Sequence, residues 1–426
     1  MQAQNSNESF ELLIHDLAQK SRQAFHVLAH IDNKMRNSAL ALIASGIRQS
    51  THEIMKVNQK DIEQALKNHL SDAMVDRLRL NAQRIEEMAV GVENIALLND
   101  PLHVVLNSWV SPVGLNISRV SVPLGVLGVI YESRPNVTID AAALAIKSGN
   151  CVILRGGSDA FHTNSLLVEI VQQGLKNSRL PKDAVLMAPD SSRGLVSAML
   201  KASGLIDVII PRGGKSLVAH VQKEARVPVL AHLDGICHMY VDRSANEDMA
   251  IKVSANAKLR RPGICGALET LLIDHSWDAR STYRLLDHLM IQGCTVLGCP
   301  MAQSLHPAVK EARSEDYGKE FLAPILAVKI VNGVVEAIHH IRQFGSGHTE
   351  SIIGEDLQVV SHFLSQVDSA IVMHNTSTQF ADGGQFGMGA EIGIATGRLH
   401  ARGPVGVEQL TSFKYIVKSD GMVRPV

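Results

Sequence analysis

The sequence predicts an α/β protein in which a doubly wound parallel sheet is followed by a second α/β unit. Short runs that are apolar throughout recur between residues 125 and 230, separated by helix-compatible stretches. Such runs are typical of parallel strands that helices cover on both faces. A similar series begins after Gly235 and continues to about Met373, and 426 residues are enough for two or three well-buried domains.

The N-terminal part of the chain is predicted to be helical from Phe10 to about Leu98. This stretch contains no proline and is rich in Ala, Leu, Gln, Lys and Glu. Breaks between helices are expected near Asn33, Thr51 and Ser71, and the Asn-Asp-Pro sequence at 99–101 ends the region.

Two segments are predicted to form exposed β structure. Residues 103–122 alternate apolar and polar side chains around Pro112-Val113-Gly114, which indicates a hairpin. The tail at 410–417 also alternates and is expected to be a strand outside both units. Strands of this kind favour strand exchange between subunits, so we expect a homo-oligomer, either a dimer or a tetramer.

The apolar runs place the individual strands of the two units. In the first unit we expect strands at 125–130, 151–154, 184–187, 207–210 and 227–230. In the second unit we expect strands at 238–241 and 268–273 and helices at 246–258 and 277–291.

Composition excludes several classes of protein. Lysine and arginine total 41 and aspartate and glutamate 42, for a net charge of −1, so we expect no nucleic-acid partner. The N-terminus lacks a basic start and an apolar core, and no apolar run is long enough to span a bilayer. We therefore expect a cytoplasmic protein that is not bound to a membrane.

The five cysteines do not suggest disulfides or a metal site. Their odd number and scattered positions are typical of a reducing compartment. Neither a CxxC pair nor an HExxH motif is present, so we expect no structural or catalytic zinc. The cysteines are Cys151, Cys237, Cys265, Cys294 and Cys299.

Two glycine-rich turns directly follow predicted strands, at 154–158 and at 211–216. A strand–glycine–helix junction lets backbone N–H groups approach an anion at a helix N-terminus, which favours a nucleotide. An ordinary βα turn is the alternative, because glycine is common there in any case. Neither turn matches GxGxxG, and the chain has no GxxxxGK[ST] sequence.

Cys265 is a candidate nucleophile because it lies on a short connector near Arg260 and Arg261. Positive neighbours lower the pKa of a thiol and enrich the reactive thiolate. The alternative is a buried, inert cysteine. His348, His374 and His400 could act as bases, or could be surface or core residues.

Several blocks resemble one known family in its own order. They are VPLGVLGVIYESRPNVTIDAAALAIKSGNCVILRGG (122–157), IPRGGKSLV (210–218), NAKLRRPGICGALETLL (256–272), FADGGQFGMGAEIGIATGRLHARGPVG (380–406) and the terminal LTSFKYI. The chain thereby resembles the gamma-glutamyl phosphate reductase family of the aldehyde dehydrogenase superfamily. The resemblance implies NADPH-dependent reduction of L-glutamyl 5-phosphate to glutamate 5-semialdehyde and phosphate, a step of proline biosynthesis. A glutamate 5-kinase upstream is a possible partner.

The resemblance also implies an aldehyde dehydrogenase-like fold with three parts. The cofactor domain would comprise 1–102 and 121–235, with 379–403 returning to it. The catalytic domain would span 236–378. A small β element for oligomerisation would comprise 103–120 and 404–426.

Site residues follow from the resemblance, position by position. Cys265 matches the nucleophile, and Asn136 matches the asparagine whose amide helps to stabilise the oxyanion, together with the backbone N–H of Cys265. Glu320 matches the glutamate that holds the nicotinamide ribose. The expected cofactor-binding turns comprise Arg155, Gly156, Gly157 and Ser158 for the adenosine ribose and its phosphate, and Gly213, Gly214 and Lys215 for the pyrophosphate and nicotinamide side.

Substrate recognition needs a cation for the α-carboxylate and donors for the phosphate. Arg134, Arg261, Arg398 and Arg402 are the candidates, and a structural salt bridge is an equal alternative for each. The position after the nucleophile, usually Asn in the family, is Gly266. The usual Gly-Gly-Lys-Glu turn is Gly-Gly-Ser-Asp at 156–159, which removes a lysine from the expected 2′-phosphate site.

Two other functions remain open from the sequence. A hydrolytic, NAD-linked aldehyde dehydrogenase needs a carboxylate base, and the stretch 232–238 offers Asp234 but no glutamate. A non-catalytic scaffold of the same fold is the second alternative.

Overall fold

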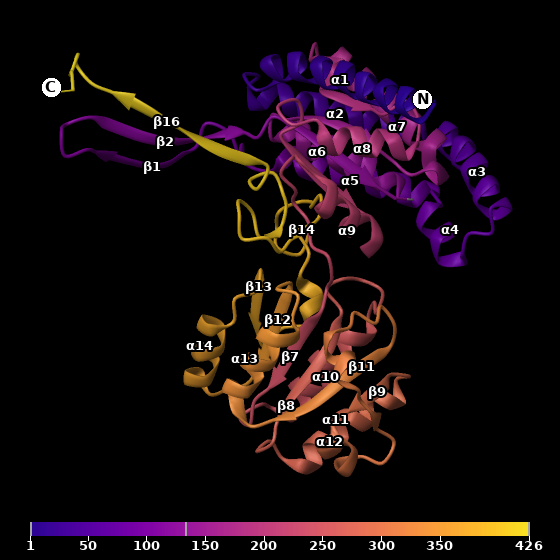
Figure 1. Cartoon of the computed structure of the whole chain (residues 1–426), viewed down its shortest axis with the longest axis vertical. Helices are drawn as coiled ribbons and strands as arrows, with labels where there is room; N and C mark the ends of the chain where they lie inside the picture. The colour runs from indigo at the N-terminus through magenta and orange to yellow at the C-terminus, as the bar shows by residue number, and fades with distance from the viewer. Residues whose placement is uncertain (1, 133, 425–426) are drawn as a thin grey trace. The chain divides into compact units, whose positions relative to one another are not determined.

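The computed structural model describes residues 2–132 and 134–424, so the outer ends of the predicted domains and Ser133 of the Tyr-Glu-Ser-Arg motif lie outside it. The chain divides into two compact units (Figure 1). The first comprises Met1–Ala231, Gly387–Gly393 and Val405–Val426, and the second His232–Phe386 and Ile394–Pro404. The segment 379–403, expected to return to the first domain, is shared between the two units.

The N-terminal region of the first unit is helical, as predicted. Its helices are α1 (Gln2–Leu28), α2 (Asn33–Gln49), α3 (Thr51–Lys67), α4 (Asp72–Leu78) and α5 (Ala82–Leu97). The three expected breaks are confirmed, and a fourth break precedes α5. Side chains cap two of the helices: Asp32 accepts from the Met35 N–H and Asn81 from the Arg84 N–H, each at 2.8 Å.

The core of the first unit is a four-stranded parallel sheet in the order β5-β4-β3-β6. Its strands are β3 (Val126–Tyr131), β4 (Cys151–Arg155), β5 (Val185–Met187) and β6 (Val208–Arg212). The intervening helices are α6 (Pro135–Lys147), α7 (Phe161–Asn177), α8 (Arg193–Lys201) and α9 (Lys215–Glu224), with short 3₁₀ turns η1 (Ser158–Ala160) and η2 (Lys182–Ala184). The doubly wound prediction is thus confirmed.

One predicted strand is wrong. Residues 227–230 do not form a strand, and only Val229 makes an isolated bridge, to Ile209. Pro228 lies inside this run and has no N–H to donate to a sheet, which limits the pairing to a single bridge.

The predicted hairpin and tail form one sheet. Strands β1 (Val105–Val110), β2 (Asn116–Pro123) and β16 (Thr411–Lys418) pair antiparallel in the order β1-β2-β16. The three strands extend as a ribbon from the helices of the first unit (Figure 1). The buried Asn150 amide anchors the tail, since its Nδ2 donates to the Leu410 carbonyl at 2.8 Å. Trp109 and Tyr415 remain 41% and 57% exposed.

The second unit contains a seven-stranded parallel sheet in the order β10-β9-β11-β8-β7-β12-β13. The strands are β7 (Cys237–Val241), β8 (Leu268–Asp274), β9 (Thr295–Gly298), β10 (Lys310–Glu311), β11 (Ile325–Val331), β12 (Thr349–Ile353) and β13 (Ile371–His374). The helices are α10 (Glu247–Leu259), α11 (Ala279–Ile291), α12 (Pro300–Leu305), α13 (Gly333–Phe344) and α14 (Leu357–Gln366), with η3 (Ser314–Gly318) and η4 (Thr378–Phe380). A two-stranded sheet, β14 (Ile394–Ala395) and β15 (Gly403–Pro404), completes the unit.

Helices cover both faces of this second sheet. Met239 and Val241 of β7 pack into one apolar cluster with α10 and α11, whereas Tyr240 packs into another with α13 and α14. Neighbouring side chains of a strand point to opposite faces, so a run that is apolar throughout serves both clusters.

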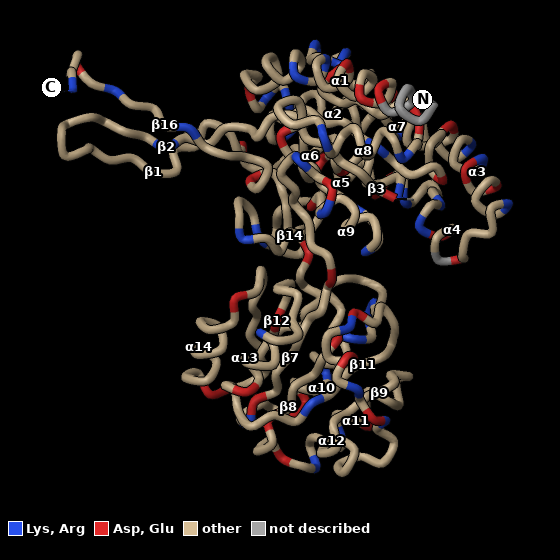
Figure 2. Tube along the Cα trace, in the orientation of Figure 1, with Lys and Arg blue, Asp and Glu red and all other residues tan. Residues whose placement is uncertain are grey.

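Charged residues of both signs are interspersed along the N-terminal helices (Figure 2). Among the helices that the structure describes, none combines the length and the apolar character needed to cross a membrane.

Candidate active site

Cys265 lies in the turn between α10 and β8 of the second unit, as the connector position predicted. It is partly exposed, whereas Cys151 and Cys237 are 0% exposed and Cys294 4%. Burial raises the pKa of the Cys151, Cys237 and Cys294 thiols, which makes them poor nucleophiles. Accessibility therefore singles out Cys265 over these three.

A buried ion pair joins the elements on either side of this turn. Lys258 of α10 and Glu269 of β8 are 0% exposed, and their Nζ and Oε2 atoms are 2.5 Å apart. Burial raises the pKa of Glu269 to about 7, and the neighbouring Lys258 ammonium acts in the opposite direction. The pair links both ends of the connector that carries Cys265.

Gly235 allows the backbone before β7 to approach the thiol turn closely. A Cβ atom at this position would lie 2.2 Å from the Cys265 carbonyl oxygen and 2.6 Å from its Cα. The Gly235 N–H donates to Glu320 Oε1 at 3.0 Å. Glu320, predicted from the resemblance to hold a ribose, thus contacts the segment packed directly against Cys265.

Two imidazoles flank the thiol. One ligating atom each from Cys265, His232 and His348 lies within 4.8 Å of the other two. The two rings pack edge to face with centroids 5.0 Å apart. Of the three histidines considered as bases, only His348 belongs to this group, whereas His374 Nε2 bonds the Gly354 carbonyl.

The Nδ1 atoms of both imidazoles have partners in the fold. His232 Nδ1 lies 2.8 Å from the Ile394 carbonyl oxygen, and His348 Nδ1 lies 2.9 Å from Thr349 Oγ1. His348 is 0% exposed, and its Nε2 has no hydrogen-bond partner. The Nε2 atoms are therefore the ones available to the thiol or to a ligand.

The buried Cys237 side chain contacts the turn that carries Cys265. Its Sγ donates to the Cys265 carbonyl oxygen at 3.2 Å and lies 3.6 Å from His348 Nδ1. Burial holds the pKa of Cys237 well above its ordinary value, so the S–H donor is retained. Cys237 is therefore a core residue that contacts the turn carrying Cys265.

In the first unit, the glycine turn before α9 already binds a carboxylate. The Gly214 N–H donates to Glu132 Oε2 at 2.8 Å, and a Cβ at Gly213 would lie 2.6 Å from the Glu132 carboxyl carbon. Lys215 is the first residue of the helix. An anionic oxygen at a helix N-terminus is the arrangement expected of a phosphate-binding turn.

The glycine turn after β4 is more constrained. Arg155 donates through Nη2 to the carbonyl oxygens of Ser191 and Ser192, and burial lowers its pKa. A Cβ at Gly156 would lie 2.4 Å from the amide nitrogen of Asn164, so this glycine is required for packing. Gly157 precedes the 3₁₀ turn that Ser158 begins.

Asn136 lies in the first turn of α6 and is exposed. Its Nδ2 donates to Asp140 Oδ2, one turn later, at 3.1 Å. Burial raises the pKa of Asp140 to about 6, against the effects of the Asn136 amide and the Arg212 charge. Asp140 thus orients the amide, a contact that the helical i,i+4 spacing could have indicated.

The candidate substrate arginines differ in their surroundings. Arg398 and Arg402 both pair with Asp368, the latter with Nη1 and Oδ1 2.7 Å apart. Arg261 is exposed, and its backbone carbonyl accepts from Gln379 Nε2 at 3.3 Å. Arg134 immediately precedes α6. For Arg398 and Arg402 the salt-bridge alternative is realised.

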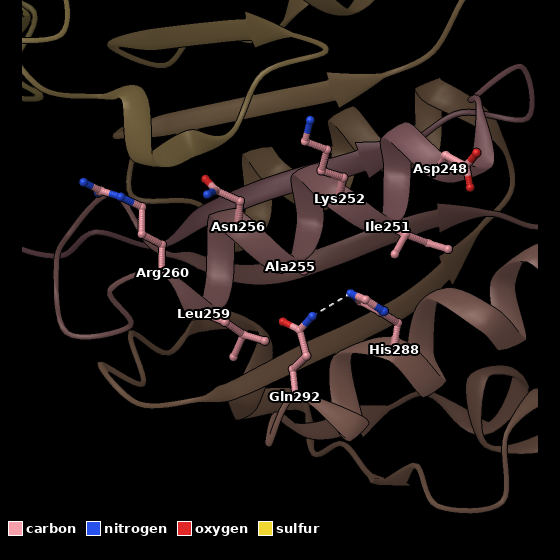
Figure 3. Close-up of a pocket in the computed structure, with 9 residues that line it drawn as sticks. All are labelled: Asp248, Ile251, Lys252, Ala255, Asn256, Leu259, Arg260, His288 and Gln292. Atoms are coloured by element: carbon pink, nitrogen blue, oxygen red, sulfur yellow. Dashed lines mark hydrogen bonds between the residues drawn. The ribbon is translucent and has the colours of Figure 1, made fainter.

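A groove of about 530 Å³ lies between α10 and α11 (Figure 3). Gln292 Nε2 and His288 Nε2 are 2.8 Å apart on its wall. None of the predicted site residues lines it; the lining consists of Asp248, Ile251, Lys252, Ala255, Asn256, Leu259, Arg260, His288 and Gln292.

Comparison with known proteins identifies the family. The aldehyde dehydrogenase family model matches residues 7–294. The gamma-glutamyl phosphate reductase of Bartonella tribocorum is 53% identical over 96% of this chain and 100% of its own length. That of Parvibaculum lavamentivorans is 51% identical over 98% of this chain and 99% of its own length.

Solved structures agree. The gamma-glutamyl phosphate reductase of Thermotoga maritima superposes with a TM-score of 0.94 at 41% identity, over 97% of this chain and 100% of that one. An acetylating aldehyde dehydrogenase of Geobacillus thermoglucosidasius, 16% identical, shares the fold with a TM-score of 0.69, over 99% of each chain. The chain therefore belongs to the aldehyde dehydrogenase family and, within it, to the gamma-glutamyl phosphate reductases.

Proposed function

We propose that the chain reduces L-glutamyl 5-phosphate to glutamate 5-semialdehyde and phosphate with NADPH, through a thioester on Cys265. The observation that carries the proposal is the accessible Cys265 thiol flanked by two imidazoles, in a chain 53% identical to a gamma-glutamyl phosphate reductase. The same arrangement speaks against a non-catalytic scaffold.

The neighbours of Cys265 prepare the thiol for attack. An imidazole with a free Nε2 can accept the thiol proton, and His232 and His348 each have their Nδ1 committed elsewhere. The thiolate then attacks the acyl carbon, forming the C–S bond. Cleavage of the C–O bond to phosphate releases the leaving group, which needs little general-acid help.

The negative charge that develops on the acyl oxygen needs positioned donors. We assign this role to the backbone N–H of Cys265 and to the Asn136 amide, which Asp140 orients. When bound, NADPH supplies the hydride that reduces the thioester. Cleavage of the C–S bond then releases the aldehyde and returns the electron pair to the Cys265 sulfur, which takes up its proton again.

The glycine turns suit the phosphates of a dinucleotide. The Gly214 N–H already takes an anionic oxygen at the N-terminus of α9, and Lys215 adds a positive charge there. Around the first turn, Gly156, Gly157 and Ser158 are assigned to the adenosine ribose. The preference for NADPH would rest on Arg155, since Ser158 and Asp159 replace the usual lysine and glutamate.

Glu320, whose Oε1 accepts from the Gly235 N–H, is assigned to the nicotinamide ribose. Among the arginines, we favour Arg134 and Arg261 for the substrate carboxylate and phosphate. Arg398 and Arg402 share Asp368 and would serve the substrate only by exchanging that partner.

Water is not the proposed acyl acceptor. Hydrolytic aldehyde dehydrogenases need a carboxylate base, and residues 232–238 contain only Asp234, on a shorter side chain than glutamate. A reverse assay with glutamate semialdehyde and NADP tests this point. Reduction of NADP should require phosphate, and phosphate-independent turnover would favour the hydrolytic function instead.

A second test addresses the nucleophile. Cys265→Ala should abolish turnover and leave NADP binding, measured by fluorescence quenching, near the original value. Cys294→Ala serves as the control, because this thiol is buried beside the sheet. Turnover retained by Cys265→Ala would refute the thioester.

We also propose that the chain assembles as a homo-oligomer through the β1-β2-β16 sheet and acts in the cytoplasm, next to a kinase that makes its substrate. Trp109 and Tyr415 are exposed on the two strands that flank β2, with ring centroids 6.1 Å apart, and this apolar pair supports self-association. Light scattering of the intact chain and of a Trp109→Lys, Tyr415→Lys variant tests the interface, and an unchanged mass would reject it.

A further inference from the structure

Cys265, His232 and His348 together form a donor set of the kind that binds soft divalent cations. Their ligating atoms lie within 4.8 Å of one another. Zn²⁺ prefers thiolate at about 2.3 Å and imidazole at about 2.0–2.1 Å. Closing these three groups onto one ion therefore needs side-chain movements on the order of 1 Å.

The surroundings of both imidazoles match those of metal ligands. A metal-bound histidine usually directs its other ring nitrogen to an oxygen acceptor, which sets the tautomer and the ring orientation. His232 Nδ1 faces the Ile394 carbonyl and His348 Nδ1 faces Thr349 Oγ1, which leaves the Nε2 atoms for a ligand.

His348 has a buried ring nitrogen whose hydrogen-bonding capacity is not satisfied. It is 0% exposed, and its Nε2 has no hydrogen-bond partner. A buried polar atom without a partner is unfavourable, so a ligand that accepts its lone pair would be stabilised there. A proton donor or a metal ion meets that requirement, and the adjacent sulfur favours the metal.

We propose that Cys265, His232 and His348 bind one Zn²⁺ ion, which reversibly blocks the thiol. Binding forms one metal–sulfur and two metal–nitrogen bonds, displaces water from the ion and releases the Cys265 proton to solvent, without any change of oxidation state. The inhibition rests on the proposed role of Cys265 as nucleophile, whereas the binding does not. Such an inhibitory ion differs from the structural and catalytic zinc that the motifs argued against.

The ligand residues are far apart in sequence, which is why no spacing motif indicated them. His232 precedes β7, Cys265 follows α10, and His348 precedes β12. Because β7 lies between β8 and β12 in the parallel sheet, the segments that enter these three strands share one edge.

Calorimetric titration of the full chain with ZnCl₂, without substrate or cofactor and with a phosphine reductant, tests the proposal. We expect one equivalent of Zn²⁺ to bind and about one proton to be released, as judged from buffers of different ionisation enthalpy. Cys265→Ser and His232→Ala should each weaken binding at least about tenfold, because each removes a ligand. His362→Ala, an exposed histidine on α14, should bind as the original chain does.

Circular dichroism checks that the variants are folded. If His232→Ala is not folded, the conservative Cys265→Ser variant still tests the site. The metal site would be overturned if Zn²⁺ did not bind the original chain. It would also be overturned if both ligand variants bound Zn²⁺ as tightly as the original chain. If that result came with turnover still abolished by Cys265→Ala, only the metal site would be rejected. Turnover retained by Cys265→Ala would reject the proposed function and leave the titration unaffected.

Discussion

Gly235→Ala is the change that most directly tests how the fold positions the thiol. The added Cβ would lie 2.2 Å from the Cys265 carbonyl oxygen, 2.6 Å from its Cα and 2.7 Å from its Cβ. Ordinary contact begins near 3.4 Å, so the turn and the segment before β7 must separate by about 1 Å. The obstructing atoms include backbone, which cannot rotate away as a flexible side chain can.

Gly235→Ala is expected to lose most of its activity while it remains folded. A displacement of about 1 Å at a reacting group can lower the rate on the order of a hundredfold. Overpacking of this kind lowers the free energy of unfolding by about 1–3 kcal/mol. We therefore expect kcat/KM to fall about a hundredfold while the chain remains folded.

The assay is NADPH formation in the reverse direction, with thermal unfolding measured on the same samples. Gly91→Ala in α5 is the matched control, because a Cβ there meets no atom within 4 Å. Alanine should stabilise this helix by up to about 1 kcal/mol and leave activity unchanged. Activity of Gly235→Ala within about threefold of the original, below the predicted hundredfold loss, would refute the argument from close packing.

Three further predictions concern stability and the oxyanion. Burial lowers the pKa of His340 to about 3, so its neutral form stabilises the fold fully above pH 6.5 and this contribution is lost as pH falls from about 6.5 towards 3. At pH 5 the free energy of unfolding is expected to be about 2 kcal/mol lower than at pH 7 because of His340. This difference, measured by urea unfolding at the two pH values, should be absent in His340→Phe. The same pH dependence in the original chain and in His340→Phe would contradict this. Asp100→Ala should destabilise the chain by about 3–5 kcal/mol in urea unfolding, because Arg36 is 0% exposed and pairs with Asp100 at 2.8 Å, whereas Asp16→Ala, at an exposed pair, should change stability by less than about 1 kcal/mol. Asn136→Ala should lower kcat about a hundredfold or more in steady-state kinetics, and a loss of only about tenfold would reduce its role to positioning.

Local sequence signals were sufficient for most of the secondary structure. Absence of proline predicted the N-terminal helices, and uniformly apolar runs predicted β3 to β6. The run at 227–230 failed because Pro228 interrupts it, a residue whose missing N–H the apolar count ignores. The break before α5 was missed because one residue, Asn81, caps the helix there, and a single capping residue is a weak signal in the sequence.

The candidate site was predicted only in part. Cys265 and its connector position followed from the sequence, because Pro262 and Gly263 end a helix and an apolar strand follows. The approach of Gly235 to Cys265 and the Glu132 carboxylate on Gly214 were not foreseen. Both depend on distances between segments that are remote in the chain.

The sequence by itself determined that this is an α/β chain with Cys265 on a short connector between a helix and a strand, because periodicity, proline and glycine act over a few residues. Only the tertiary structure decided what surrounds that cysteine. Packing of parallel strands brings His232 and His348 to the thiol and leaves Gly235 no room for a side chain. The segment between β14 and β15 pairs Arg398 and Arg402 with Asp368. These contacts arise from strand order and burial, which no local pattern encodes.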